Sequence, residues 1–437
     1  MKTDTVTAGR AAYHFRPLNV GRWLLWGLFA AVLLVAPKLW TSGLGLTMLS
    51  QMGIAVIACL AYNVLLGQGG MLSFGHAVYS GLGSFLAIHT LNAVSAGQLA
   101  IPVSLIPLVG GLAGLFFSAL LGYVTTRKAG TTFAMITLGI GELVWSMSLM
   151  IPEFFGGEGG ISGNRVVGKA VAGISFGPQV QMYYLIAVYT FVSTAALFAF
   201  TRTPLGRMLN AVRDNPERVE FIGYSTQHVR YLAFMVSGFF AGIAGGLGAL
   251  NLEIVTAEVV GAARSGAYLL FVFLGGATFF FGPIIGAVLL VLAQVLSEVT
   301  KAWVLYLGLV FLFMVMYAPG GVASLIMMNL RLAAFGKLRD LWTSYAALGG
   351  TAFVMLAGAG AMIEMLYHLQ LNTALGPELR FMGVALNAQS AESWFGAAMV
   401  LACGIALFEL TRRHFVADWE RIQEEIEKEI KRREALI

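Results

Sequence analysis

Runs of apolar residues, each about 20 residues long, recur along this chain of 437 residues and constrain its fold more than any other feature. A helix of about 20 apolar residues spans the hydrocarbon core of a bilayer, whereas a membrane β-strand would show alternating segments of about 10 residues. Only 11% of the residues are charged, against roughly a quarter in soluble domains. The sequence therefore predicts an all-α polytopic membrane protein.

The apolar runs define a bundle of about 10–12 transmembrane or re-entrant helices. The expected spans are approximately 23–41, 44–66, 71–91, 101–126, 131–151, 181–201, 232–251, 266–281, 284–300, 302–318, 346–367 and 393–411. The segments 71–91 and 266–281 are rich in glycine, and either could re-enter or break instead of spanning fully.

The distribution of Lys and Arg predicts how the chain crosses the membrane, because these residues favour cytoplasmic loops. With the N-terminus inside and twelve alternating spans, 21 of the 27 Lys and Arg residues fall in cytoplasmic segments. Both termini are therefore expected in the cytoplasm, with residues 1–22 kept as an uncleaved N-terminal segment. These basic residues lie at helix ends, so the net charge of +5 does not indicate a nucleic-acid partner.

The segment "TPLGRMLNAVRDNPERVEFIGYSTQHVR", residues 203–230, interrupts the apolar pattern with seven charged residues. Leu205, Leu209 and Val212 form one apolar helical stripe. The following "DNPER" predicts that a first helix stops and a second one starts. On charge alone, a solvated loop that merely obeys the preference for positive charge inside explains the segment equally well.

The second helix of this segment has recognisable start and stop signals. Asn215 is a good N-cap, and Pro216 fits the first helical turn. Glu217 places negative charge at the new N-terminus, and Gly223 suits the residue after the C-cap. We therefore expect two short helices with a bend at the membrane surface.

Two features of the apolar segments suggest a substrate pathway. Residues 67–85, "GQGGMLSFGHAVYSGLGSF", combine many glycines with the polar residues Ser73 and His76, as in helices broken around a cavity. Glu142 is a carboxylate within an apolar span, where ionisable residues usually face the bundle interior. The alternatives are tight helix packing with a hydrogen-bonded His76, and, for Glu142, a purely structural hydrogen bond or a position near a helix end.

The end of the chain differs from the rest, because residues 412–437 are highly charged. Apolar residues at helical spacing and Glu–Lys pairs four residues apart predict a cytoplasmic amphipathic helix. The chain contains no G-x-S-x-G, H-E-x-x-H or Walker A motif, and its six histidines are scattered. The sequence thus predicts no enzyme activity, no metal site and no cofactor bound by this chain.

Taken in order, several stretches resemble the LivM-type permease subunits of ATP-binding-cassette importers for branched-chain and other hydrophobic amino acids. The strongest is "GRMLNAVRDNPERVEFIGYS" followed by an apolar, glycine-rich helix. The other matching stretches are "YNVLLGQGGMLSFGHAVYSGLGSF", "TTFAMITLGIGELVWSM", "FGGEGGISG" and "SGAYLLFVFLGGATFFFGPIIGAVLL".

The resemblance implies a multi-pass protein of the bacterial inner membrane that pairs with a second homologous permease subunit. Two cytoplasmic subunits would bind and hydrolyse ATP with Mg²⁺, and a periplasmic binding protein would deliver the substrate. The loop 202–231 would carry the coupling helix that docks on an ATPase subunit. The coupling residues implied are Arg207, Arg213, Asp214, Asn215, Glu217 and Gly223, and Ser73, His76 and Glu142 are expected to line the pathway.

The resemblance also divides the chain, since a typical member of the family ends near residue 330. Residues 23–320 form the expected permease core, residues 321–411 an extension with two further spans, and residues 412–437 the charged helix. Three alternatives remain open: the same machinery with urea, short amides or aromatic acids as cargo, a secondary transporter driven by an ion gradient, and a membrane scaffold.

Overall fold

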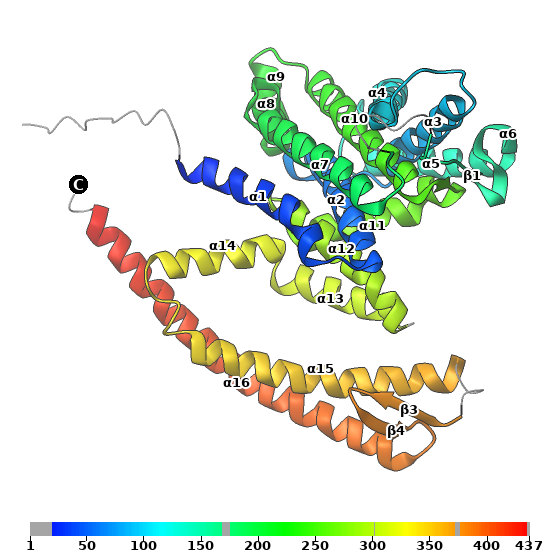
Figure 1. The fold of residues 1–437 in the computed structure, drawn as a ribbon. Coiled ribbons are helices and arrows are strands. Elements are labelled where there is room, and N and C mark those ends of the chain that lie inside the picture. Colours follow the sequence, from blue (N-terminus) through cyan, green and yellow to red (C-terminus); the bar gives the residue numbers. More distant parts are fainter. Residues whose placement is uncertain (1–19, 168–174, 301, 372–375, 435–437) are drawn as a thin grey trace, which may run out of the picture. The chain divides into compact units, whose positions relative to one another are not determined.

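The computed structural model describes residues 20–167, 175–300, 302–371 and 376–434, and these form two compact units that divide between Gly266 and Ala267 (Figure 1). Among its described residues, the regular secondary structure of the first unit is helical apart from the two-residue antiparallel pair β1 (Ile161–Ser162) and β2 (Ile254–Val255). Its α-helices are α1 (Val20–Leu39), α2 (Gly43–Asn63), α3 (Ala77–Ser95), α4 (Ile106–Thr125), α5 (Gly130–Met150), α6 (Pro152–Phe155), α7 (Gln179–Arg202), α8 (Pro204–Asp214), α9 (Pro216–Phe221) and α10 (Thr226–Leu252).

The predicted all-α polytopic membrane architecture is confirmed. Within the described residues, seven helices are long and apolar enough to cross a bilayer, and one further bent pair passes the same test together. Shorter apolar helices cover Trp23–Leu39, Ala262–Gly275 and Gly282–Ser297. Each of the twelve predicted spans contains a helix, because a long apolar run can satisfy its backbone in a membrane only by helical hydrogen bonding.

The core of the first unit is built around α2 and α10. Most residues of α2 are buried, and this helix packs against both α7 and α10. Helix α10 also packs closely on α3 and α4, through glycines that let the backbones approach. A methyl group on Gly242 would lie 2.2 Å from the carbonyl oxygen of Gly110, so this contact requires glycine.

The glycine-rich segment 71–91 is a broken helix. Helix α2 continues into a π-helical turn, Val64–Gln68, and the chain is then irregular over residues 69–76 before α3 begins at Ala77. We call residues 69–76 the break. The second glycine-rich segment, 266–281, contains α11 (Ala262–Gly275), followed by a turn in which Gly276 has a φ of 108°.

The second unit contains α12 (Gly282–Val299), α13 (Trp303–Tyr317), α14 (Gly321–Ala334), α15 (Trp342–Leu371) and α16 (Ala391–Glu434). Helices α13 and α14 are bent by 49° relative to each other. Helices α15 and α16 lie side by side, and the antiparallel hairpin β3 (Glu378–Phe381) and β4 (Val384–Asn387) lies in the connection between them (Figure 1). The hairpin packs on α15 through Phe381, Leu379 and Leu386.

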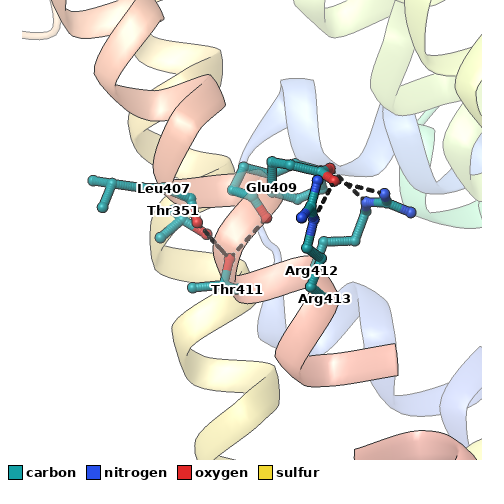
Figure 2. A network of polar contacts seen from close by, with 7 residues as sticks. Thr351, Leu407, Glu409, Thr411, Arg412 and Arg413 are labelled. Carbon is teal, nitrogen blue, oxygen red and sulfur yellow. Dashed lines mark hydrogen bonds and ion pairs between the residues drawn. The ribbon is translucent and has the colours of Figure 1, made fainter. Parts of the chain in front are cut away.

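Helix α16 joins two segments that the sequence predicts as separate, the span 393–411 and the charged helix 412–437. Neither Gly nor Pro occurs after Gly404, so nothing in the sequence stops the helix where the charge begins. Thr411 hydrogen-bonds Thr351 of α15 at 2.8 Å, while Glu409 pairs with Arg412 and Arg413 on the exposed side (Figure 2).

The charged part of α16 packs against its own chain. Ile422 and Ile426 are buried with Leu332 of α14 and Leu341, while Phe415, Trp419 and Ile430 contact the same cluster. Polar contacts surround this cluster, between Lys337 and Glu425 at 2.6 Å and between Ser344 and Asp418 at 2.7 Å. The apolar stripe of the predicted amphipathic helix is therefore covered within the chain.

Candidate functional site

The charged segment between α7 and α10 folds into the two short helices that the sequence predicts. Thr203 caps α8 by accepting a hydrogen bond from the Gly206 amide at 3.2 Å. Asn215 separates the helices and caps α9, with Pro216 in the first turn. Gly223 follows α9 with a φ of 88°, a conformation that a residue without a side chain adopts at little cost. We call α8 and α9 the coupling helices, after the role that the family resemblance implies for this segment.

The inner face of the coupling helices is apolar and buried. Leu209 and Val212 of α8 and Val219 of α9 are each at most 2% exposed. Helix α8 packs on α7, α10 and the π-helical turn Val64–Gln68. The predicted apolar stripe thus fixes the coupling helices to the first unit, and leaves only their outer face for a partner.

The Arg213 side chain extends to the π-helical turn Val64–Gln68. Its Nη1 donates a hydrogen bond to the carbonyl oxygen of Gly67, and its Nε and Nη2 lie 2.9 Å from Oδ1 of Asp214. The side chain also covers Gly70, which has a φ of 63°. Arg213 and Asp214 keep side-chain exposures of 37% and 66% beside these contacts, and Arg207 and Glu217 are exposed as well.

Sequence reasoning missed the most exposed apolar residues of the segment. Phe221 is 89% exposed, Ile222 65% and Tyr224 53%, and we call these three residues the outer patch. Beside it lies a groove of about 460 Å³ lined by Arg202, Pro204, Arg207, Met208, Ala211 and Ile222. The sequence does contain a signal for this patch, because its three residues flank Gly223 and lie outside the stripe of Leu205, Leu209 and Val212.

The break holds the predicted pathway residues Ser73 and His76, and both are fully buried. The Ser73 carbonyl accepts a hydrogen bond from the Tyr62 hydroxyl at 2.9 Å, and the His76 ring packs edge-on against Tyr62 with centroids 5.1 Å apart. The Phe74 amide donates to Oγ1 of Thr137 at 3.1 Å. Neighbouring helices therefore satisfy the irregular backbone, as burial in a membrane protein requires.

Glu142 lies elsewhere, on the exposed face of α5 together with Met135 and Leu143, which are 70% and 57% exposed. An ionisable side chain in the middle of an apolar span is costly when it faces lipid. The structure thus places the three predicted pathway residues in two settings, two inside the packed core and one on the outer surface.

A buried polar network around Arg165 joins the N-terminus of α7 to the C-terminus of α10. Its guanidinium donates to the Asn251 carbonyl at 3.0 Å and to Oε1 of Gln179 at 3.1 Å. Its backbone amide donates to Oε1 of Glu253 at 2.8 Å. A cation at the C-terminus of α10 also complements the helix dipole. Because the coupling helices connect the other ends of α7 and α10, these two helices are tied together at both ends.

Comparisons with known proteins agree with these features. The family model described as "Branched-chain amino acid transport system / permease component" matches residues 45–319. The chain is 29% identical over 301 residues to the high-affinity branched-chain amino acid transport system permease protein LivM of Salmonella typhimurium, covering 64% of this chain and 70% of the relative. It is 27% identical over 302 residues to LivM of Escherichia coli, with the same coverage. No solved structure matches the chain significantly.

Proposed function

This chain belongs to the family of branched-chain amino acid transport system permease components, and we propose that it is the membrane-spanning subunit of an ATP-driven, binding-protein-dependent importer for branched-chain or related hydrophobic amino acids. It is a multi-pass membrane protein and not itself an enzyme. In the proposed assembly, two cytoplasmic subunits bind ATP and Mg²⁺, and a periplasmic protein supplies the substrate. Both termini lie in the cytoplasm, and the membrane is the bacterial inner membrane.

The observation that carries the coupling role is the outer patch. Phe221 ends α9, and Ile222 and Tyr224 follow it, so the outer patch lies at the end of a helix whose Val219 is buried. Large aromatic side chains of this kind are typical anchors of protein interfaces. Exposed Arg207 adds positive charge at the rim of the adjacent groove. We assign the outer patch to the contact with an ATPase subunit, and expect that subunit to offer an apolar cleft with acidic residues at its edge.

Glu142 supports the pairing with a second permease subunit. Because its carboxylate lies on the exposed face of a membrane-spanning helix, a protein surface or a water-filled path must cover it in the assembly. A homologous subunit packed against α5 would provide the protein surface and would enclose the water-filled path. The translocation path then runs along α5 between the two permease subunits, with Glu142 at its wall.

The test is reconstitution of the chain with a second permease subunit, two ATPase subunits and a periplasmic binding protein in proteoliposomes. We expect ATP hydrolysis to rise with loaded binding protein, and leucine uptake to require ATP. Urea, short amides and aromatic acids, tested in parallel with their binding proteins, decide the cargo. Uptake by this chain alone, driven by a proton or sodium gradient, would contradict the proposal.

A further inference from the structure

We propose that Arg213 is the positioning residue through which movement of the coupling helices reaches the break in the first unit. The inference rests on the proposed function, because it assumes that an ATPase subunit moves α8 and α9. It adds a defined route, which runs from Arg213 through the break to α5, where it ends at the residue next to Glu142.

The route begins at the carbonyl oxygen of Gly67, in the π-helical turn that ends the second span. Arg213 lies 146 positions further along the chain and donates its Nη1–H to this oxygen. Carbonyl groups at the end of a helix lack partners within the helix, and a cation is favourable there. Asp214 holds the Nε–Nη2 side of the guanidinium, which fixes the direction of the donated hydrogen bond.

Packing joins the same two elements. A methyl group on Gly69 would lie 3.2 Å from Cδ1 of Leu209, and one on Gly70 would lie 2.8 Å from Cγ of Arg213. The side chains of α8 thus occupy the space that two glycines of the break leave open. Since close-packed side chains are hardly compressible, a displacement of α8 displaces the start of the break with it.

The far end of the break contacts α5. The Phe74 amide donates to Thr137, and a methyl group on Gly75 would lie 2.1 Å from the Thr137 carbonyl oxygen. One turn further along α5, the Gly75 Cα lies 3.5 Å from the position of a methyl group on Gly141. Glu142 is the next residue. Contacts and the short backbone of the break therefore connect Arg213 to the buried face of α5, at the residue next to Glu142.

An irregular segment suits this role better than a regular helix would. Two of its backbone groups bond side chains of other helices: the Ser73 carbonyl accepts from Tyr62 of α2, and the Phe74 amide donates to Thr137 of α5. Such bonds can exchange when the segment shifts, without unwinding a helix. Arg213 would then set which of two arrangements of the break is populated.

The experiment compares Arg213→Gln, Arg213→Lys and, as a matched control, Arg218→Gln, which removes the same charge from an exposed position of α9. Each variant is assembled with its partners in proteoliposomes. Co-purification of the ATPase subunits, ATP hydrolysis and leucine uptake are then measured, and the readout is uptake per ATP hydrolysed.

We expect Arg213→Gln to assemble and hydrolyse ATP, but to lose about tenfold in uptake per ATP, the order that one charge-assisted hydrogen bond can shift. Arg213→Lys keeps a positively charged donor and should recover most of the loss, whereas Arg218→Gln should match the parent protein. Asp214→Asn loosens the guanidinium without removing it and should give a smaller loss of uptake per ATP. It replaces Arg213→Gln as the test if that variant does not fold.

Two results overturn the inference: an unchanged uptake per ATP in Arg213→Gln, or a loss of ATPase binding that accounts for all of its defect. Failure of the proposed function looks different. In that case the parent protein itself neither retains the ATPase subunits nor needs ATP for uptake.

Discussion

Asn215 accepts a hydrogen bond from the backbone amide of Arg218 at 3.0 Å, and this contact starts α9. Asn215 itself has an extended backbone, with φ of −157° and ψ of 97°, so it ends α8 and caps α9 at the same position. Because α9 has only six residues, it cannot be stable without its cap and its packed Val219. The orientation of the outer patch depends on this cap.

Replacing Asn215 with Ala should therefore loosen α9 without unfolding the first unit. Loss of an N-cap costs about 1 kcal/mol, which is enough to raise hydrogen exchange of the Val219 and Glu220 amides several-fold. Asn215→Asp, which keeps a capping oxygen, should exchange like the parent protein. Equal protection in Asn215→Ala would show that packing alone holds the helix.

Phe221→Ser should weaken binding of the ATPase subunits while leaving the stability of the permease unchanged. The side chain is 89% exposed, so its removal costs nothing in the folded chain. At an interface, an anchor of this size contributes about 2 kcal/mol, or roughly 30-fold in Kd. Binding of the purified ATPase subunits to the detergent-solubilised permease measures the effect.

The control for that prediction is the neighbouring Val219, which is 2% exposed. Val219→Ser should lower the thermal stability of the permease, since it places a hydroxyl in an apolar contact. If Phe221→Ser lowers thermal stability as much as Val219→Ser does, the outer patch is packed inside the protein and is not a docking surface.

Gly70→Ala should destabilise the first unit. The φ of 63° costs a residue with a side chain about 1–2 kcal/mol, and the new methyl group would press on Cγ of Arg213 at 2.8 Å. Thermal unfolding in detergent provides the measurement. Gly139→Ala is the matched control, because nothing lies within 4 Å of its methyl position and alanine favours the helix; a lower melting temperature there would contradict the argument.

The charged end of α16 should be held mainly by the apolar contact of Ile426, and only weakly by the ion pair between Lys337 and Glu425. Ile426 is 2% exposed, so Ile426→Ala should cost about 2–5 kcal/mol and raise hydrogen exchange along the charged part of α16. The hydrogen bond to Glu425 raises the pKa of Lys337. The ion pair therefore stabilises the folded chain at neutral pH and is lost only when the pH rises above the ordinary lysine range. Both side chains are exposed and screened, so Lys337→Gln should change exchange little.

Glu364 should hold the second unit together within its membrane-spanning part. Its Oε1 accepts hydrogen bonds from Thr300 at 2.5 Å and from Tyr306 at 3.0 Å. Glu364→Leu leaves both hydroxyl groups without this acceptor and should cost about 1–3 kcal/mol, whereas Glu364→Gln retains an oxygen and should cost less. Thermal unfolding of the two variants distinguishes them, and equal stability of all three proteins would refute the role.

The local signals in the sequence were sufficient wherever the structure depends on neighbours along the chain. Asn215, Pro216 and Gly223 located the ends of α9, and the glycines around Ser73 located the break. The extension carries a further local signal. Met382 and Gly383 both have positive φ, at 50° and 85°, as a two-residue hairpin turn requires, and they connect β3 to β4.

The tertiary structure decided what each side chain contacts. The sequence alone determined a membrane-spanning bundle, its helices and its charged insert, because hydropathy and capping act over a few residues. It could not show that Arg213 turns inward to Gly67, that His76 is buried while Glu142 is exposed, or that Ile426 packs on Leu332. Each of these depends on which helix lies beside which, and the sequence period of one helix does not encode its neighbours.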